Sequence, residues 1–148
     1  MKSIAILGAT GSIGQSALAV VDAHPDKLRV VALAAGGNAA RLAEQSRRYR
    51  PSLVALATEA AGREFSRTQE GARSPDVACG PDALLRVATH PEADIVLFAS
   101  SGTAALEAVL AAIEAGKSIA LANKEILVMA GAVVMAAARA KHVPVLPV

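Results

Sequence analysis

Short apolar runs recur along the chain and alternate with longer stretches that carry helical periodicity. Each run spans four or five residues, which is too short for a helix, and each is too evenly apolar for a half-exposed antiparallel strand. We therefore predict that the runs are buried strands of a parallel sheet. They occupy residues 3–7, 29–33, 53–56, 94–98, 118–121 and 143–146.

Between these strands, apolar residues recur at the spacing of a single helix face. One stripe comprises Leu106, Val109, Leu110 and Ile113, a second Ile126, Leu127, Ala130, Val133, Val134, Ala137 and Ala138, and a third Ile13, Ala17, Val20 and Val21. Gly116 follows the first stripe and is typical of a helix C-terminus. The alternation predicts a doubly wound, mostly parallel α/β sheet of the Rossmann type, with helices on both faces. The 148 residues suit one domain, 1–148.

Residues 68–81 interrupt this alternation. Glycine and proline punctuate the stretch, which leaves room only for a short strand around residues 77–79. We expect this segment to be a connection at one edge of the sheet. The final residues, 146–148, indicate the carboxyl end of a strand, where open α/β sheets place their ligands, so we expect the sequence to stop just short of the chemistry.

Composition and charge narrow the function classes. The chain is 53% hydrophobic and only 2% aromatic, which excludes a disordered or collagen-like protein. The net charge of +2 hints at an anionic partner, but seven arginines between residues 41 and 73 are interleaved with four glutamates. Such interleaving is typical of a solvated helix face. With so few aromatic residues for base stacking, we expect no nucleic-acid partner.

No segment suggests a membrane or an export route. The longest uncharged run, residues 4–21, contains three glycines and four polar side chains, which would leave a membrane helix polar and loosely packed. The same residues break the apolar centre that a signal peptide needs. A single cysteine, Cys79, cannot form an internal disulfide. We expect a cytoplasmic protein without a membrane partner.

A glycine-rich turn follows the first strand and opens directly into a helix. It comprises Gly8, Ala9, Thr10, Gly11, Ser12, Ile13 and Gly14. A diphosphate at such a helix N-terminus would meet unpaired backbone N–H groups and the positive end of the helix dipole, while the glycines permit close approach. The spacing Gly-x-x-Gly-x-x-Gly differs from the commoner Gly-x-Gly-x-x-Gly. Its position nevertheless favours a dinucleotide site over a turn without a ligand.

The end of the second strand bears on which dinucleotide binds. Enzymes selective for NAD usually carry an acidic residue there, roughly 20 residues after the glycines, that binds the ribose 2′-hydroxyl. This sequence instead has Ala34-Ala35-Gly36-Gly37-Asn38, with Arg41 one turn further on. Because no carboxylate would repel a 2′-phosphate, the pattern favours NADP. The alternative is that Asn38 is only a helix N-cap and Arg41 only a surface residue.

Two further strand ends carry small or polar residues. Ala99, Ser100, Ser101, Gly102 and Thr103 follow one of them, and Ala122, Asn123, Lys124 and Glu125 the other. The small residues would let a ring or a ribose approach, although Ser101 and Thr103 fit a plain helix cap equally well. Asn123 and Glu125 also fit a helix N-terminus. The Lys124 cation opposes the helix dipole, so a negative group such as a substrate phosphate explains it better.

Metal-binding and catalytic patterns are not evident in this sequence. His24, His90 and His142 have no partner at metal-ligand spacing and are expected to be turn residues. Cys79 has no evident base, and the aspartates are scattered. We find neither a metal site nor a complete catalytic constellation.

In combination these motifs resemble the N-terminal NADPH-binding domain of the 1-deoxy-D-xylulose 5-phosphate reductoisomerase family. The resemblance covers the glycine turn, residues 35–38, 115–117, 120–125, 127–128, 130–131 and 146–148. The most specific part is Leu-Ala-Asn-Lys-Glu at residues 121–125, preceded by Ala-Gly-Lys at 115–117. The resemblance implies an NADPH-dependent enzyme of the methylerythritol phosphate route to isoprenoids. Such an enzyme rearranges its sugar phosphate and reduces the resulting aldehyde to 2-C-methyl-D-erythritol 4-phosphate, with Mg²⁺ or Mn²⁺.

The resemblance also implies roles for single residues. Thr10, Gly11, Ser12 and Ile13 would hold the diphosphate and the nearby ribose, Gly36, Gly37 and Asn38 the 2′-phosphate end, Asn123 and Glu125 would face the nicotinamide side, and Lys124 would contact the substrate. The family's metal-binding Asp-Ser-Glu-His segment follows its Leu-Pro-Val. We therefore expect the metal and catalytic residues, with the remaining domains, to lie beyond Val148, and this fragment alone to be inactive. The longer protein would be a homodimer.

Three departures from the family pattern affect the cofactor pocket. Gly37 stands where many members carry a basic residue, Ile126 replaces an expected Ser or Thr, and Ser100-Ser101 replaces a more apolar turn. They leave the fold unaffected. Two other functions remain open on the residues alone: a different NADP-dependent Rossmann oxidoreductase, and a non-catalytic module that senses a nucleotide.

Overall fold

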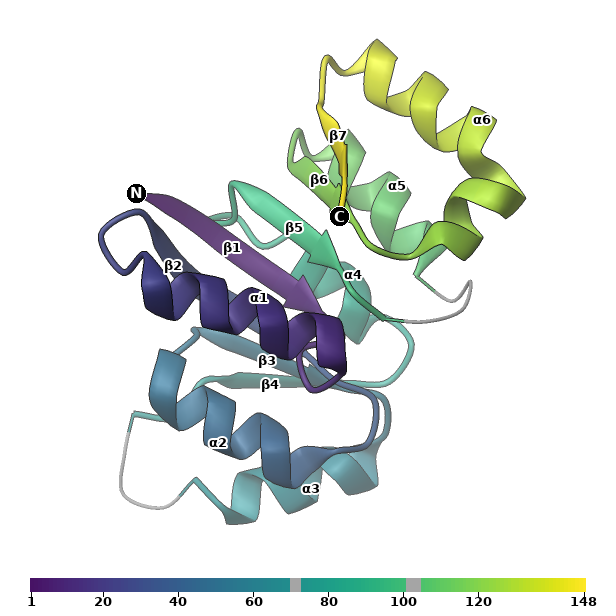
Figure 1. Ribbon diagram of the computed structural model, residues 1–148. Coiled ribbons are helices and arrows are strands. Elements are labelled where there is room, and N and C mark those ends of the chain that lie inside the picture. The colour runs from purple at the N-terminus through teal and green to yellow at the C-terminus, as the bar shows by residue number, and fades with distance from the viewer. Residues whose placement is uncertain (70–72, 101–104) are drawn as a thin grey trace.

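Seven parallel strands form one sheet in the part of the chain that the structure describes (Figure 1). The computed structural model describes residues 1–69, 73–100 and 105–148. The strands are β1 (Lys2–Leu7), β2 (Leu28–Ala34), β3 (Leu53–Leu56), β4 (Asp76–Cys79), β5 (Ile95–Phe98), β6 (Ser118–Leu121) and β7 (Val145–Pro147). The helices are α1 (Ser12–Ala23), α2 (Ala39–Tyr49), α3 (Glu59–Arg67), α4 (Ala83–Ala88), α5 (Leu106–Glu114) and α6 (Lys124–Ala140).

The strand order is β4-β3-β2-β1-β5-β6-β7, which confirms the predicted doubly wound sheet. The chain builds the sheet outward from β1 in one direction and then returns to build outward from β5 in the other. The order therefore reverses between β1 and β5, which pair directly. In open α/β sheets, ligands bind at the carboxyl ends of the strands beside such a reversal.

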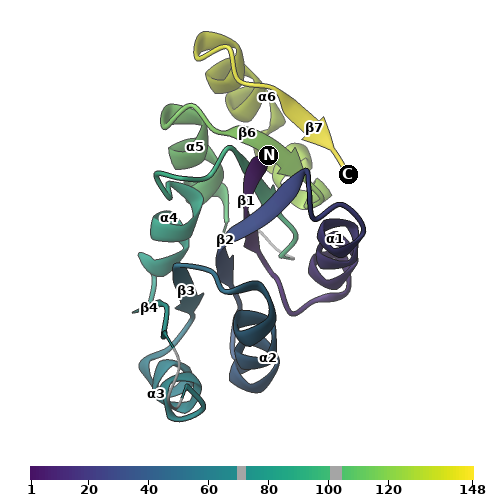
Figure 2. The same ribbon diagram turned by 90° about the vertical axis from the view of Figure 1, so that its left-hand side faces the viewer.

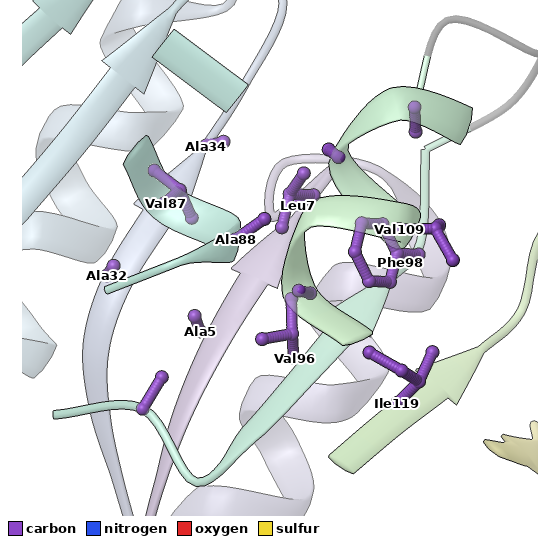
Figure 3. Packing of buried hydrophobic residues seen from close by; sticks show 14 of the residues in the cluster. Ala5, Leu7, Ala32, Ala34, Val87, Ala88, Val96, Phe98, Val109 and Ile119 are labelled. Carbon is purple, nitrogen blue, oxygen red and sulfur yellow. The ribbon is translucent and has the colours of Figure 1, made fainter. Parts of the chain in front are cut away.

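Helices cover both faces of the sheet (Figure 2). Each face has its own apolar core. Helices α1 and α2 lie on one side, where Leu18, Leu42 and the α3 residue Phe65 are buried. Helices α4, α5 and α6 lie on the other. Figure 3 shows Val87 of α4 and Val109 of α5 in this second core, with Phe98 of β5. In β1, Ile6 packs into the first core and its neighbours Ala5 and Leu7 into the second, because successive strand side chains point to opposite faces.

The predicted helix stripes are confirmed for α5 and partly wrong for α1. In α5, Val109 and Ile113 are buried, and Gly116 follows with the positive φ of a helix C-terminus, +78°. In α1 the buried residues are Gly14, Leu18 and Val21, whereas the predicted Ile13 and Val20 are 41% and 51% exposed. Apolar residues occupy several sides of α1, so periodicity alone did not fix its rotation.

The stripe predicted for α6 is also only partly right. Ile126, Val134 and Ala138 are buried, but Leu127 and Val133 are 37% and 57% exposed. The reason is a kink: Ala130 has the non-helical angles φ −140° and ψ 24°. A single helical repeat therefore does not run unbroken through the whole of α6.

The remaining elements follow the sequence prediction closely at one edge and less closely at the other. β4 is the edge strand expected within residues 68–81. β7 begins at Val145, two residues later than predicted, and α4 was not predicted at all. Within the described residues, no helix has both the length and the apolar character needed to cross a membrane.

Candidate functional site

The glycine turn links β1 to α1 at the carboxyl edge of the sheet, beside the reversal of strand order. Its first two residues, Gly8 and Ala9, both donate backbone N–H bonds to the carbonyl of Ala34 at the end of β2, at 3.0 and 2.9 Å. Gly11 then donates to the Gly8 carbonyl at 3.2 Å. These three bonds close the turn and hold it against β2.

Two of the three glycines are needed for the chain's own packing. Gly8 has φ +85°, and a Cβ there would lie 2.6 Å from the backbone nitrogen of Ser100. A Cβ on Gly14 would lie 2.3 Å from the Gly8 carbonyl oxygen. Neither position has room for a side chain, because backbone atoms cannot move aside as the end of a side chain can. Gly14 thus lets α1 start directly against the turn.

Gly11 is different, because nothing within the described chain requires a glycine there. A Cβ at Gly11 would meet only the Gly8 carbonyl oxygen, at an ordinary contact distance of 3.5 Å, and the residue has a normal φ of −77°. Gly11 is exposed on the surface of the turn. In dinucleotide sites the middle glycine of such a turn permits the diphosphate to approach the backbone.

The first turn of α1 offers backbone donors at this position. Gly11 is the N-cap and makes no side-chain cap, and the first bond of the helix runs from the Gln15 N–H to the Gly11 carbonyl at 2.9 Å. The N–H groups that precede it have no helical acceptor, as at every helix start. Thr10 is half-buried, and Ser12 and Ile13 are exposed around them. The arrangement suits an anion.

A second loop, residues 35–38, lies beside the turn and follows β2. It is fixed to β3 by the bond from the Ala35 N–H to the Ala55 carbonyl at 2.9 Å. Gly36 and Gly37 are exposed, and a Cβ at either would meet nothing within 4 Å. Asn38 is the N-cap of α2, which was the alternative considered for this residue: its Oδ1 accepts from the Arg41 N–H at 3.1 Å. Arg41 is exposed in the first turn of α2.

The third loop, at the end of β6, is organised by Asn123, which is only 5% exposed. Its Nδ2 donates to the Ser100 carbonyl at 2.9 Å, and its Oδ1 accepts from the Ile126 N–H at 3.3 Å. Asn123 therefore caps α6 and also holds the segment that follows β5. Lys124 and Glu125 are exposed in the first turn of α6.

The predicted site residues thus come together from the ends of four strands. The turn after β1 is bonded to the end of β2, and Ser100 lies against Gly8 on one side and is bonded to Asn123 on the other. Of the residues predicted to admit a ring or a ribose, Ser101, Gly102 and Thr103 lie outside the described residues.

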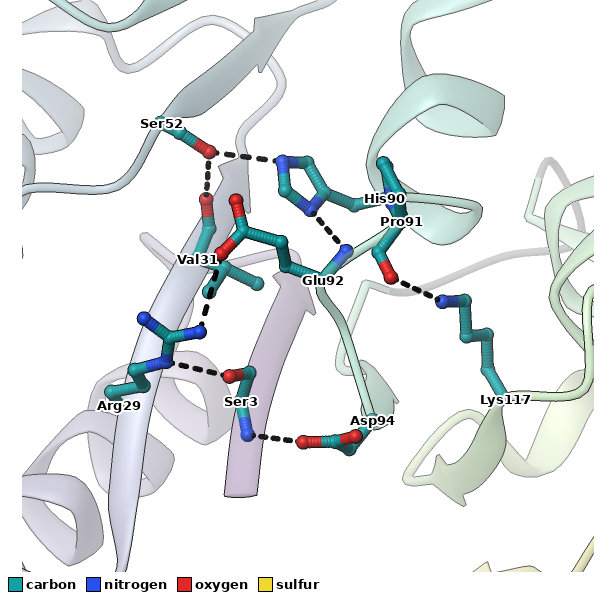
Figure 4. A network of polar contacts seen from close by, with 9 residues as sticks. All are labelled: Ser3, Arg29, Val31, Ser52, His90, Pro91, Glu92, Asp94 and Lys117. Carbon is teal, nitrogen blue, oxygen red and sulfur yellow. Dashed lines mark hydrogen bonds and ion pairs between the residues drawn. The ribbon is translucent and has the colours of Figure 1, made fainter. Parts of the chain in front are cut away.

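Other titratable residues singled out in the sequence lie elsewhere. His24 ends α1 and His142 has φ +56° in a turn, as predicted. His90 also lies in a turn, but it is buried and bonded to Ser52 in a polar network (Figure 4). Burial raises the pKa of the Cys79 thiol, with a further rise from Glu59 and an opposing effect of Arg63, so the thiol stays protonated.

Sequence reasoning missed one residue that contacts the turn. Gln45, on α2, donates from Nε2 to the Ala9 carbonyl at 2.8 Å and is only 8% exposed. A signal was present, because Gln45 follows the buried Leu42 by three residues and so falls on the inward face of the helix. A glutamine in such a position requires an explanation.

Comparison with known proteins decides the family. A family model described as 1-deoxy-D-xylulose 5-phosphate reductoisomerase matches residues 4–131, which include the turn, the second loop and the start of α6. This chain belongs to the 1-deoxy-D-xylulose 5-phosphate reductoisomerase family. The membership confirms the resemblance on which the site residues were assigned.

Relatives of known name and structure agree with this membership. The 1-deoxy-D-xylulose 5-phosphate reductoisomerase of Symbiobacterium thermophilum is 54% identical over 99% of this chain and 39% of its own length. The Zymomonas mobilis reductoisomerase in complex with NADPH has a TM-score of 0.92 and 38% identity, over 99% of this chain and 38% of that one. A DOX-P reductoisomerase in complex with NADPH, fosmidomycin and magnesium has a TM-score of 0.93 and 35% identity, over 99% of this chain and 36% of that one. This chain therefore spans about two fifths of the length of its reductoisomerase relatives.

Proposed function

We propose that this chain is the NADPH-binding domain of an enzyme that converts 1-deoxy-D-xylulose 5-phosphate to 2-C-methyl-D-erythritol 4-phosphate. Family membership supports the proposal, and a similar structure was solved in complex with NADPH. The observation that carries it is Gly11, a glycine that the chain's own packing does not require, at a helix start with no side-chain cap. A bound diphosphate accounts for both features.

The diphosphate is held by the backbone of residues 10–13. The N–H groups at the start of α1 donate to its oxygens, and the Thr10 and Ser12 hydroxyls add donors, because anions at helix N-termini gain both hydrogen bonds and the helix dipole. Ile13 is exposed beside them and provides an apolar contact to the adjacent ribose. The missing Cβ of Gly11 is what allows the phosphate oxygens to reach these groups.

The 2′-phosphate is held by the second loop. Gly36 and Gly37 leave the backbone open to an approaching phosphate. The Asn38 oxygen already caps α2, so Asn38 contributes chiefly by fixing the loop. Arg41, in the first turn of the same helix, supplies the positive charge that replaces the basic residue many family members carry at position 37.

The nicotinamide and the substrate lie toward the start of α6. Asn123 holds the Ser100 segment in place beside the turn, and Glu125 faces the nicotinamide side. NADPH, when bound, supplies the hydride that reduces the aldehyde. The exposed Lys124 ammonium pairs with the substrate phosphate, which offsets its unfavourable position at a helix N-terminus.

The metal of the proposed reaction needs ligands from elsewhere. Within the described ranges, no three His, Cys, Asp or Glu side chains gather as metal ligands, so these residues do not fit Mg²⁺ or Mn²⁺. We propose that the metal is bound by residues of the longer protein that this chain does not include, and that the longer protein is a cytoplasmic homodimer.

The test of cofactor binding is a calorimetric titration of this chain with NADPH and with NADH. We expect tighter binding of NADPH, because no carboxylate stands at the end of β2 and Arg41 is available to the 2′-phosphate. Arg41→Ala should reduce the ratio of NADPH affinity to NADH affinity by about tenfold, which is the effect of losing one charge-assisted contact. Equal affinity of the wild-type chain for both nucleotides, or no binding of either, would overturn the proposal.

The role of Lys124 is testable in a full-length reductoisomerase that carries this domain. Lys124→Ala should raise KM for the sugar phosphate by about 10- to 100-fold, since it removes a charge-assisted contact, while NADPH affinity stays within a few fold. Glu114→Ala, which changes an exposed charge paired with Lys141 at the far end of α5, serves as the control. A loss of NADPH binding with unchanged KM for substrate would reverse the assignment.

A further inference from the structure

Gln45 connects α2 to the glycine turn through a buried hydrogen bond. Its side chain lies on the inward face of α2, beside Leu42 and Ser46, and is 8% exposed. Its Nε2 donates to the Ala9 carbonyl at 2.8 Å, and Ala9 is itself fully buried. The orientation of the amide follows from the chemistry, because a carbonyl can only accept and Nε2 is the end that donates.

Fixing the Ala9 carbonyl also fixes the next backbone donor. In a trans peptide the C=O of one residue and the N–H of the next point in opposite directions within one plane, and no peptide bond among the described residues is cis. While Gln45 holds the Ala9 carbonyl toward α2, the Thr10 N–H must point away from α2. Among the described residues the Thr10 N–H donates no backbone hydrogen bond, and Gly11, the next residue, lies exposed.

The next peptide, between Thr10 and Gly11, has a similar side-chain hydrogen bond that constrains its direction less. Gln15 donates from Nε2 to the Thr10 carbonyl at 2.9 Å, but this contact is exposed, so water can replace the side chain. Water cannot as easily replace Gln45 beside the fully buried Ala9. Of the two glutamines, Gln45 is therefore the one that determines the direction of a peptide in the turn.

Packing alone does not explain a glutamine at position 45. Its Oε1 is buried and has no hydrogen-bond partner among the described residues, an arrangement that destabilises a folded protein. An apolar residue of the same length would fill the same space between Leu42 and Ser46. The favourable contact of this amide is at its other end, where Nε2 binds the Ala9 carbonyl.

We propose that Gln45 is a positioning residue of the dinucleotide site, which holds the Thr10 N–H toward the cofactor diphosphate through its bond to the Ala9 carbonyl. The inference rests on the proposed NADPH site and adds a residue to it that does not touch the cofactor. It also ties the turn to α2, whose N-terminus carries the loop for the 2′-phosphate. The two ends of the cofactor site thereby share one rigid support.

The test compares two nucleotides on this chain and on Gln45→Met, which keeps the length of the side chain and removes the donor. NADPH contains the diphosphate, whereas adenosine 2′-monophosphate occupies only the second loop. Gln45→Met should weaken the binding of NADPH by about tenfold, which is the effect of a misdirected hydrogen bond to a charged group. The affinity for adenosine 2′-monophosphate should stay within about twofold of the wild-type value. The thermal midpoint should move little, because the variant leaves one buried oxygen, that of Ala9, unpaired in place of another.

Ser46→Ala is the matched control, since it changes a buried polar side chain on the same face of α2, and no hydrogen bond joins that side chain to the turn among the described residues. It should bind both nucleotides as the wild type does. Equal weakening of both nucleotides by Gln45→Met, unchanged NADPH affinity, or an equal effect of Ser46→Ala would overturn the role of Gln45. These outcomes are distinct from failure of the proposed function, in which the wild-type chain itself would not bind NADPH.

Gln45→Glu gives a second test that does not depend on the methionine variant folding. A protonated carboxyl can donate to the Ala9 carbonyl, but a carboxylate cannot. The ratio of the variant's NADPH Kd to the wild-type Kd should therefore rise with pH as the carboxyl ionises. A role limited to filling space predicts a ratio independent of pH, and that result would overturn the proposal.

Discussion

The three glycines of the turn differ in what a side chain at each position would disturb. At Gly14 an added methyl group would lie 2.3 Å from the Gly8 carbonyl oxygen, so Gly14→Ala must push α1 away from the turn. We expect it to lower the free energy of unfolding by roughly 2–3 kcal/mol, as overpacking of a rigid site does. Urea denaturation followed by circular dichroism measures this directly.

Gly11→Ala should behave in the opposite way. The methyl group has room within the chain, so stability should change by less than about 1 kcal/mol, but the group would stand where the diphosphate approaches. We expect about tenfold weaker NADPH binding, equivalent to about 1.4 kcal/mol. Similar losses of stability in the two variants would show that Gly11 also serves only the fold.

What the sequence predicts at single residues depends on whether their role is local. The roles of Gly116 and Asn38 were predictable because a helix end is defined by its own few residues. The contact of Gln45 was not, because it joins residues 36 positions apart. The NADPH and substrate contacts of the site residues stay predictions until ligand binding is measured.

The loop between α4 and β5 fastens the amino ends of the central strands through polar contacts (Figure 4). Asp94 accepts the Ser3 N–H at 2.8 Å, and Arg29 on β2 bridges Ser3 and Glu92. In the same loop the buried His90 accepts the Glu92 N–H at Nδ1, at 3.2 Å. Its proton must therefore be on Nε2, which lies 2.9 Å from the Ser52 hydroxyl. Ser52 in turn donates to the Val31 carbonyl.

This geometry predicts how stability depends on pH. Burial lowers the pKa of His90 below its ordinary value of 6.5; nearby Glu92 opposes the shift and Lys117 adds to it. The folded state therefore prefers the neutral ring. The contribution of His90 to the free energy of unfolding is fully present above pH 6.5 and declines as the pH falls from there toward the lowered pKa. Protonation would also place a hydrogen on Nδ1, facing the Glu92 N–H.

The measurement is the thermal midpoint of the wild type and of His90→Gln between about pH 8 and about pH 5. We expect the midpoint of the wild type to drop more steeply over this range than that of the variant, which lacks the titrating ring. If the thermal midpoints of the two proteins fell in parallel with pH, His90 would not be the source of the pH dependence of stability.

Helices and strands were predicted with unequal success, for a physical reason. Strands buried on both faces are recognised by composition alone, which is why the core of the sheet was predicted. The rotation of α1 was not, because its apolar residues surround the helix and a glycine, Gly14, determines which side meets the turn. The kink at Ala130 lies beside Gly131, a glycine signal that the predicted stripe did not take into account, so the α6 stripe was extended too far.

At the level of the whole chain, α6 carries an apolar surface that no described residue covers. Val128, Met129 and Val133 are 86%, 54% and 57% exposed. Large apolar side chains exposed on one element promote association in water when they lie close together. We expect this chain to self-associate as its concentration rises, and Val128→Gln combined with Val133→Gln to reduce the association without lowering the thermal midpoint. Sedimentation velocity at several concentrations measures it.

The neighbouring Val134 is the control for that experiment. It is fully buried, so Val134→Gln places an amide in the core and should destabilise the chain by roughly 2 kcal/mol or more. If the exposed and buried substitutions destabilised equally, the outer side of α6 would be packed against something in this chain.

The central position of β1 has a consequence for synthesis on the ribosome. β1 emerges well before one of its two neighbours, β5, which begins only at Ile95. A nascent chain can assemble β1 to β4 while one edge of β1 still has open hydrogen-bonding groups, and such an edge invites wrong pairing. The segment from β1 to β4 therefore remains open to mispairing until β5 arrives to close that edge.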